Sequence, residues 1–116
     1  MEDRIEGKGV MFYKDGDRYD GGFCNNKREG EGTYYWRNGD KFVGIFVQDQ
    51  IDGTGVYYYI SGGRYEGEFK DGRKEGRGTY YGKDGSKYVG NWRSGKFDGN
   101  GKMHYASRYA FFLYGG

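Results

Sequence analysis

The sequence of 116 residues contains no proline, one cysteine and one histidine. Because it lacks proline and a three-residue glycine period, the chain is not collagen-like. Cys24 has no second cysteine to pair with, which excludes an internal disulfide and is compatible with a reducing compartment. No apolar run approaches the roughly 20 residues of a membrane helix, and Met1–Arg4 lacks the apolar core of a signal peptide. We therefore expect a cytoplasmic protein.

Aliphatic residues are also scarce, whereas aromatic residues and glycines are abundant. Hydrophobic residues make up 34% of the chain, and aromatic residues alone contribute 21%. The 25 glycines argue against a helical bundle, since each glycine costs about 1 kcal/mol in a helix. Disordered chains are usually poor in aromatic residues. A net charge of +2 is too small for a dedicated nucleic-acid binder, so we expect no nucleic-acid partner. These features predict an aromatic-packed β structure.

The glycines and aromatic residues recur with a period of 23 residues. Glycine columns begin at Gly7, Gly9, Gly16 and Gly21. Two aromatic columns keep the same period: Tyr19, Phe42, Tyr65 and Tyr88, and then Phe23, Phe46, Phe69 and Trp92. Such a period indicates a repeat architecture. We divide residues 1–116 into one array with a partial unit at 1–18, repeats at 19–41, 42–64, 65–87 and 88–110, and a degenerate C-terminal segment at 105–116.

Each repeat is predicted to form a β-hairpin. Residues 19–23 and 30–36 alternate as strands do, and Asn25 and Asn26 lie between them at a turn. In every repeat the second turn residue is Asn, Asp or Gly, which tolerate the positive φ of two-residue hairpin turns. Consecutive hairpins then extend one antiparallel sheet. The predicted fold is an all-β, elongated single-sheet solenoid of stacked 23-residue hairpins.

The glycines next to the rings predict a tightly packed aromatic face. Strands lie about 4.8 Å apart, so a large ring needs a neighbouring position without a side chain. We expect Gly21, Gly30 and Gly32 to leave that space. Gly82 stands where Tyr13, Trp36, Tyr59 and Tyr105 stand in the other units, which predicts a hollow there.

The chain resembles the MORN (membrane occupation and recognition nexus) repeat family. The resemblance is carried by Tyr65–Gly72, the Gly-x-Gly at Gly76–Gly78 and the turn at Asp84–Gly85, and Tyr88–Gly95 repeats the pattern. It implies stacked hairpins and a non-enzymatic scaffold that binds other proteins in cytoskeletal, ciliary or membrane-junction assemblies. Two alternatives also follow from the resemblance: a phosphoinositide-binding module, and the targeting part of a larger enzyme.

The residues themselves predict no catalysis, metal or cofactor. Catalysis needs converging side chains, but His104 lies more than three repeats from Cys24. Carboxylates such as Glu29 and Glu31 follow basic residues, and we interpret them as a solvated, salt-bridged surface.

Three sets of residues are candidates for binding. The first is the two aromatic columns that begin at Tyr19 and Phe23, which either receive a partner's helix or extended segment or simply hold the sheet together. The second is a row on the opposite face, in which nothing in the repeat demands an aromatic residue: Phe12, Tyr35, Tyr58 and Tyr81. The third is a basic column that could meet lipid headgroups, although Asp17, Asp40 and Asp84 weaken its field: Arg18, Lys41, Arg64 and Lys87.

The two ends of the array leave further alternatives open. A sheet with open edges invites self-association. After Tyr105 the repeat pattern degenerates into the apolar stretch Tyr109–Tyr114. We interpret this stretch as a capping unit, with continued repeats or separately built, joined segments as the alternatives.

Overall fold

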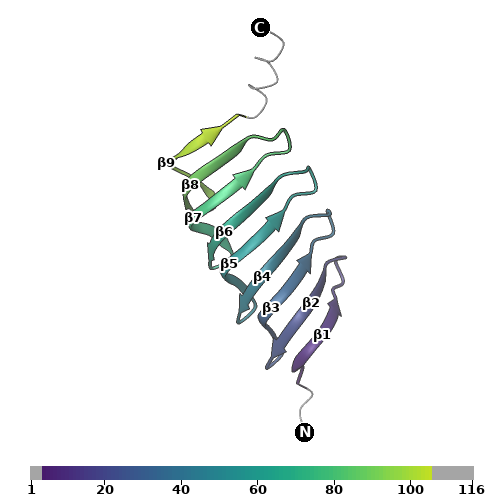
Figure 1. Ribbon diagram of the computed structural model, residues 1–116. Helices are drawn as coiled ribbons and strands as arrows, with labels where there is room; N and C mark the ends of the chain where they lie inside the picture. Colours follow the sequence, from purple (N-terminus) through teal and green to yellow (C-terminus); the bar gives the residue numbers. More distant parts are fainter. Residues whose placement is uncertain (1–3, 106–116) are drawn as a thin grey trace, which may run out of the picture.

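The computed structural model describes residues 4–105, apart from the side chain of Asn100, and shows one antiparallel sheet of nine strands in chain order (Figure 1). The strands are β1 (Gly7–Phe12), β2 (Arg18–Cys24), β3 (Lys27–Tyr35), β4 (Lys41–Val47), β5 (Gln50–Tyr58), β6 (Arg64–Lys70), β7 (Arg73–Tyr81), β8 (Lys87–Arg93) and β9 (Lys96–His104). The molecule measures 72 × 26 × 19 Å. Its radius of gyration is 17.5 Å, whereas a compact domain of this size has about 13 Å. The predicted elongated all-β sheet is confirmed. The apolar C-terminal stretch lies outside the described residues.

The hairpin turns have the predicted positive φ angles. Asn25 and Asn26 have φ of 51° and 69°, and Gln48 and Asp49 have 46° and 74°. Two consecutive positive φ values characterise the type I′ turn, whose twist matches that of the flanking strands. The first residue of each turn also has a positive φ. The sequence did not indicate this at Gln48, because glutamine is not a residue that favours positive φ.

The turns of neighbouring hairpins are bonded to one another along one rim of the sheet. The Asp49 amide donates to the carbonyl of Arg28 at 3.0 Å, and Gly95 donates to Lys74 at 3.0 Å. The Glu29 carboxylate accepts the amide of Gln48 at 2.9 Å. Glu29 therefore satisfies the backbone of the next turn, a role beyond the solvated surface charge that its neighbours suggested.

A bend at the same place in each hairpin curls the sheet across its width. The pairing of β2 with β3 shifts between Gly21 and Phe23, and the same shift recurs in each later hairpin. Opposite this bulge lies Gly30, with φ of 86°. Bulges of this kind bend the strand and increase its twist. The assignment of Gly30 to ring packing was wrong: a Cβ there would meet no atom within 4 Å, so its positive φ is what requires glycine.

Gly21 and Gly32 do leave space for a ring, as predicted. They face each other across β2 and β3, and the ring of Tyr19 lies over them. A Cβ on Gly32 would lie 2.6 Å from Cε1 and Cζ of that ring. The Tyr19 hydroxyl donates to the carbonyl of Gly22 at 2.9 Å. The glycines thus allow the sheet to bury a tyrosine without a second layer of structure.

Phe42 occupies the same place as Tyr19 and Tyr65 but has no hydroxyl. Tyr65 donates to Glu68 O at 2.9 Å, as Tyr19 does to Gly22. In the corresponding geometry, Phe42→Tyr would donate to the carbonyl of Ile45. We expect this variant to raise the free energy of unfolding by about 1 kcal/mol, the usual net value of a hydrogen bond. Urea unfolding of both proteins measures the difference; a loss of stability would show that the ring pocket at Phe42 is narrower than that at Tyr19.

Candidate binding site: the aromatic trough

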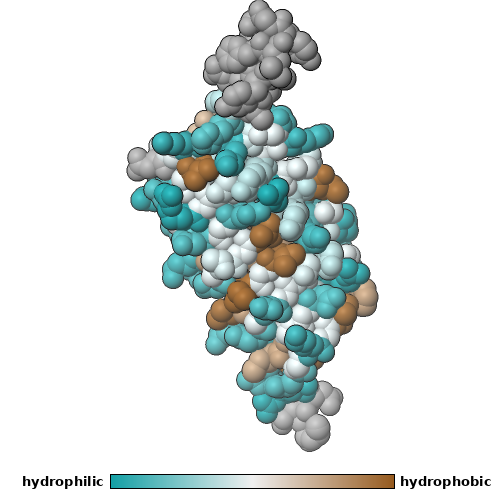
Figure 2. Space-filling view, viewed as in Figure 1, coloured by the Kyte–Doolittle hydropathy of each residue, from teal (hydrophilic) through white to brown (hydrophobic). Residues whose placement is uncertain are grey.

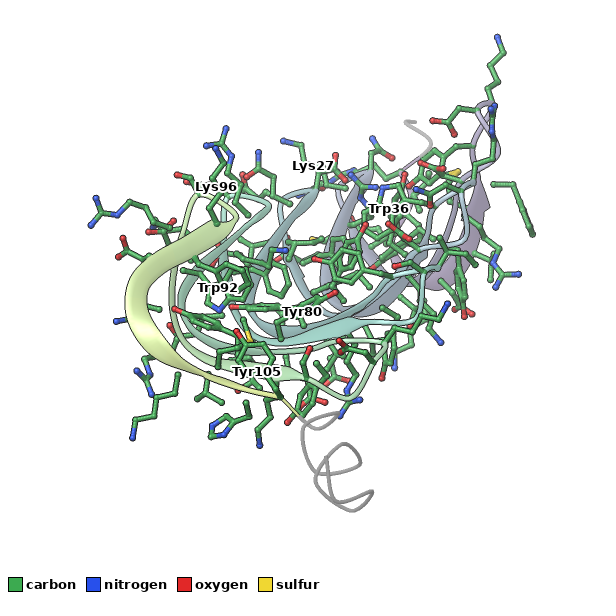
Figure 3. The ribbon with its side chains drawn as sticks, turned by 90° about the horizontal axis from the view of Figure 1, so that it is seen from above. Lys27, Trp36, Tyr80, Trp92, Lys96 and Tyr105 are labelled. Atoms are coloured by element: carbon green, nitrogen blue, oxygen red, sulfur yellow. The ribbon has the colours of Figure 1, made fainter. Side chains whose placement is uncertain are left out.

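The curled sheet forms a trough, and its concave face carries most of the aromatic side chains. Figure 3 shows Trp36, Tyr80 and Trp92 pointing into the space that the strands enclose, with Lys27 and Lys96 near one rim. The aromatic side chains form two rows along the trough, which we call the floor and the wall. The floor consists of Tyr19, Phe23, Phe42, Phe46, Tyr65, Phe69, Tyr88 and Trp92. The wall consists of Tyr13, Tyr34, Trp36, Tyr57, Tyr59 and Tyr80.

The floor is the hydrophobic core of the protein. Its side chains are between 0% and 8% exposed. Successive rings meet edge to face: Tyr19 contacts Phe46 with centroids 4.9 Å apart, and Phe42 contacts Phe69 at 5.0 Å. These are the two aromatic columns singled out from the sequence. Because their rings are buried, they offer a partner almost no surface, and holding the sheet together is the role that their packing describes.

The wall is the aromatic surface that remains accessible in the trough. Its rings are half-buried and stack in a continuous series, with Tyr34 to Trp36 at 4.8 Å and Trp36 to Tyr57 at 5.0 Å between centroids. The series continues from Tyr57 to Tyr59 at 4.6 Å. Sequence reasoning did not select these residues as a site, although the 23-residue columns of Tyr34 and Trp36 were visible. The missing knowledge was which face of the sheet is concave.

Two carboxylates fix the wall to the turns between hairpins. Asp17 accepts the hydroxyl of Tyr34 at 2.8 Å, and Asp40 accepts that of Tyr57 at 2.8 Å. Burial, the hydrogen bond to Asp17 and its charge raise the pKa of Tyr34 to about 12. Burial and Asp40 likewise raise the pKa of Tyr57. The wall rings near these carboxylates therefore keep their protons over the neutral range.

The wall changes at Tyr80. Gly63 stands where Asp17 and Asp40 stand in the preceding repeats, and a Cβ at this glycine would lie 2.5 Å from the Tyr80 hydroxyl oxygen. The row of rings ends at Gly82, where the sequence predicted a hollow. The space next to the Cα atom of Gly82 is instead filled by neighbouring side chains. A Cβ there would lie 2.6 Å from Ser86 Oγ. The sequence exception at Gly82 thus marks the end of the wall.

Two cations enter the trough at equivalent positions. Arg28 pairs with Phe23 across the hairpin, and Lys74 pairs with Phe69 in the same way. Arg28 forms an ion pair with Asp49, with Nε 3.1 Å from Oδ1. Lys74 Nζ lies 4.9 Å from the Trp92 ring centroid and donates to the Tyr59 hydroxyl. Burial lowers the pKa of Lys74.

Two hollows lie between the wall and the rim of hairpin turns. One of about 310 Å³ is lined by side chains that include Arg28, Trp36 and Asp49. The next, of about 330 Å³, is lined by Trp36, Ile51, Tyr57, Tyr59, Phe69, Gly72, Arg73, Lys74 and Gly95. Trp36, Ile51 and Gly72 border both hollows, so the hollows adjoin. The trough thus offers apolar rings beside charged groups, a combination found in binding sites.

On the convex face, the predicted basic column and the predicted tyrosine row pair with each other. Arg18 and Tyr35 are cross-strand partners, and the guanidinium carbon lies 3.9 Å from the ring centroid. Arg64 lies over Tyr81 at 3.9 Å, and Lys41 Nζ lies 4.9 Å from the ring of Tyr58.

The last cation and the first ring of these two convex-face rows are arranged differently. Lys87 Nζ lies 5.9 Å from the centroid of the Tyr81 ring. Phe12 is 73% exposed. Tyr35, Tyr58 and Tyr81 therefore have a structural role on the convex face, because each ring lies against a cation of the neighbouring strand. The face in Figure 2 carries hydrophilic residues along its sides, a band of intermediate hydropathy along its middle, and separate hydrophobic groups.

The family assignment follows from the repeat pattern. Among residues 4–105, no helix is long and apolar enough to cross a membrane. None of the curated proteins matches the chain in sequence. The MORN repeat model matches residues 1–18, 19–41, 42–64, 65–87 and 88–108. MORN repeats are generally modules for interaction with proteins or membranes, and the family is not typically enzymatic. The chain belongs to the MORN repeat family.

Proposed function

We propose that the protein is a non-enzymatic scaffold whose trough binds a segment of a partner protein. The observation that carries this proposal is the wall: six half-buried rings in one series, beside two adjoining hollows. Rigid tyrosine and tryptophan side chains provide large contact areas and lose few rotors on binding. A helix or an extended peptide fits a long groove of this kind better than a small ligand does.

Neighbouring residues on opposite faces of the sheet test this proposal. Tyr59 lies in the trough, whereas Tyr58 lies on the convex face and is 39% exposed. We would place a photo-crosslinking amino acid at position 59 or at position 58 and identify the captured segment by mass spectrometry. Capture of a defined partner segment through position 59 alone supports the proposal, and capture through position 58 alone contradicts it.

The captured segment then allows the affinity of the trough to be measured. We expect Trp36→Ala to weaken its binding about tenfold or more, as truncation of a central aromatic contact does. The triple variant Tyr35→Ala, Tyr58→Ala and Tyr81→Ala changes only the convex face and serves as the control. If the triple variant loses affinity and Trp36→Ala does not, the partner binds the convex face.

A second candidate function is binding to anionic phospholipid. It is favoured by the regular column of cations on the convex face: Arg18, Lys41, Arg64 and Lys87. Each cation near a charged membrane surface contributes about 1 kcal/mol. However, the Arg64 Nε atom lies 2.7 Å from Glu66, so its charge is partly compensated. A flotation assay with anionic liposomes tests this candidate. If the bound fraction does not fall after Lys41, Arg64 and Lys87 are changed to Gln, the column does not bind the lipid.

The setting of the scaffold is also proposed. We infer a cytoplasmic location in a cytoskeletal, ciliary or membrane-associated assembly, with the array acting alone or as the targeting part of a larger enzyme. In the described residues, β1 pairs only with β2 and β9 only with β8, which leaves open edges for self-association. The mass of the protein in solution tests whether these edges join two copies.

A further inference from the structure

The two trough cations differ in one respect that bears on what the trough binds. Arg28, Ile51, Lys74 and Phe97 share one register position, opposite Phe23, Phe46, Phe69 and Trp92. Arg28 has its counter-ion within the protein, because Asp49 in the next hairpin turn accepts from its Nε. The Arg28 Nη2 atom also donates to the Asp49 carbonyl at 2.8 Å. The charge of Arg28 is therefore already paired with a carboxylate of the protein.

Lys74 lacks such a counter-ion. Gly95 has the same place in the next turn as Asp49, and its amide donates to Lys74 O just as Asp49 donates to Arg28 O. Without a side chain, Gly95 offers no carboxylate. Among residues 4–105, no carboxylate oxygen lies within 4.0 Å of Lys74 Nζ. The backbone of the Arg28 site is reproduced at Lys74, but the acid is missing.

The ammonium group of Lys74 is held inside an aromatic enclosure. Its Nζ lies 4.9 Å from the centroid of the Trp92 ring, 5.2 Å from that of Tyr59 and 5.5 Å from that of Tyr65. Lys74 is half-buried and also lines the hollow of about 330 Å³. A cation that is partly removed from water and faces an apolar hollow gains more from an anion than an exposed cation does.

The charges around the two hollows are unequal. The hollow at Arg28 is lined by two acidic residues, Asp49 and Asp71. The hollow at Lys74 is lined by two cations, Lys74 and Arg73, and by no acidic residue. Its remaining lining is largely aromatic and includes three residues of the wall: Trp36, Tyr57 and Tyr59. The chemistry of this hollow is thus complementary to an anionic group next to a large apolar one.

We propose that the hollow at Lys74 binds a carboxylate of the partner segment, with the neighbouring apolar side chain of that segment placed against Trp36 and Tyr59. The carboxylate is an Asp or Glu side chain or the C-terminus of the partner. This inference rests on the proposed binding of a protein segment in the trough. It fixes one position of the motif that the trough recognises: an acidic residue beside an aromatic or aliphatic residue.

A protein segment fits this hollow better than a lipid does, because of the position of the cation. Lys74 projects from the concave face, where Trp36, Tyr57 and Tyr59 line the hollow with it. A membrane surface presents its phosphates in a plane, and a plane meets the convex face or the rims before it meets the inside of a trough. A peptide can place one carboxylate within the trough while its backbone follows the long axis.

Two substitutions change the anion site in opposite ways. Lys74→Met removes the cation at a position where Ile51 and Phe97 show that the fold accepts apolar residues. Gly95→Asp supplies the missing internal acid. Its φ of 85° is close to the 74° of Asp49, and a Cβ there would meet no atom within 4 Å. Lys27→Met is the charge-matched control, because Lys27 lies near the rim.

The experiment selects ligands from a display library of random peptides, using the complete chain as bait. We expect peptides selected on the wild type to share an acidic residue beside an aromatic or aliphatic one. Such a peptide should bind Lys74→Met and Gly95→Asp about tenfold more weakly, in line with the loss of one charge-assisted hydrogen bond. Lys27→Met should bind it as the wild type does, and Lys74→Arg should retain most of the affinity.

A double-mutant cycle then assigns the contact. Changing the acidic residue of the peptide to its amide should weaken binding to the wild type and cause no further loss with Lys74→Met. One result would overturn this inference and leave the proposed function standing: the selected peptides lack an acidic residue, and their binding is lost with Trp36→Ala but not with Lys74→Met. If no peptide is selected, both fail. Binding of phosphoinositide vesicles that is lost with Lys74→Met would identify a lipid phosphate as the anion and overturn the peptide proposal.

Discussion

Replacing Gly32 with alanine is expected to destabilise the protein by about 3 kcal/mol, near the upper end of the usual cost of overpacking. The added methyl group would lie 2.6 Å from two carbons of the Tyr19 ring. This ring has little room to move, because its hydroxyl donates to Gly22 O and the ring packs edge to face with Phe23 and Phe46. The backbone cannot move either, since β3 is paired on both sides. Urea unfolding followed by far-ultraviolet circular dichroism measures the loss.

The array provides matched controls for this substitution. Gly9 belongs to the same glycine column, but a Cβ there would meet no atom within 4 Å. We expect Gly9→Ala to change the free energy of unfolding by less than about 0.5 kcal/mol. Gly30→Ala tests backbone strain alone, because Gly30 has positive φ and open space, and it should cost about 1 kcal/mol. Equal losses at Gly9 and Gly32 would mean that ring packing is not the reason for this glycine column.

These glycines show how much of the fold can be predicted from the sequence. The period places every hairpin, and the turn residues at Asn25 and Asn26 specify their type, because few residues accept a positive φ. The role of Gly32 also follows from the alternation of side chains in a strand. The role of Gly30 does not. Its positive φ belongs to a bulge, and a bulge depends on how two strands pair rather than on the pattern within one strand.

The candidate site was less predictable because curvature decides which aromatic residues a partner can reach. Both faces carry aromatic columns in the sequence, and only the bends at the bulges make one face concave. Tyr19 and Tyr34 lie on the same face, yet Tyr19 is 0% exposed and Tyr34 remains half-buried in the wall. On the convex face, Tyr35 has a structural partner in Arg18 that alternation alone does not reveal.

The trough cations illustrate a second limit of sequence reasoning. Lys74 and Arg28 occupy one column with Ile51 and Phe97, so the column looks irregular rather than functional. Its meaning depends on the residue in the next turn, either Asp49 or Gly95. The sequence contains both residues of each pair, but they are separated by 21 residues. Only the register of adjacent hairpins brings them together.

The second large effect is expected at Asp40, which links the wall to the turn between hairpins. Its carboxylate accepts the Tyr57 hydroxyl at 2.8 Å through Oδ2 and the Ile60 amide at 2.8 Å through Oδ1. Asp40→Ala removes both bonds and leaves a half-buried hydroxyl without its acceptor. Hydrogen bonds to charged groups contribute about 1.5–3 kcal/mol each, so we expect a total loss of about 3 kcal/mol after partial replacement by water. Urea unfolding near neutral pH measures this loss.

The same variant should change the response of the protein to alkaline pH. In the folded state burial and Asp40 raise the pKa of Tyr57, so the folded protein holds this proton more tightly than the unfolded chain does. The resulting stability is fully present below the unfolded tyrosine pKa of about 10 and is lost as the pH rises towards the folded value. With Asp40→Ala, the pKa of Tyr57 is no longer raised by the hydrogen bond and the charge of Asp40, so the loss of stability with rising pH should be shallower.

A phenolate absorbance titration above about pH 8 compares the proteins, and Tyr57 should ionise at a lower pH in Asp40→Ala than in the wild type. Asp40→Asn is the informative control: its amide oxygen can still accept from Ile60, but its charge is gone, so its stability should lie between those of the wild type and Asp40→Ala. Tyr34 and Tyr65, whose pKa values are raised to about 12, should titrate alike in all three proteins. If Asp40→Ala left both the stability and the titration unchanged, the wall would be held by ring stacking alone, and its attachment to the turn would have no energetic role.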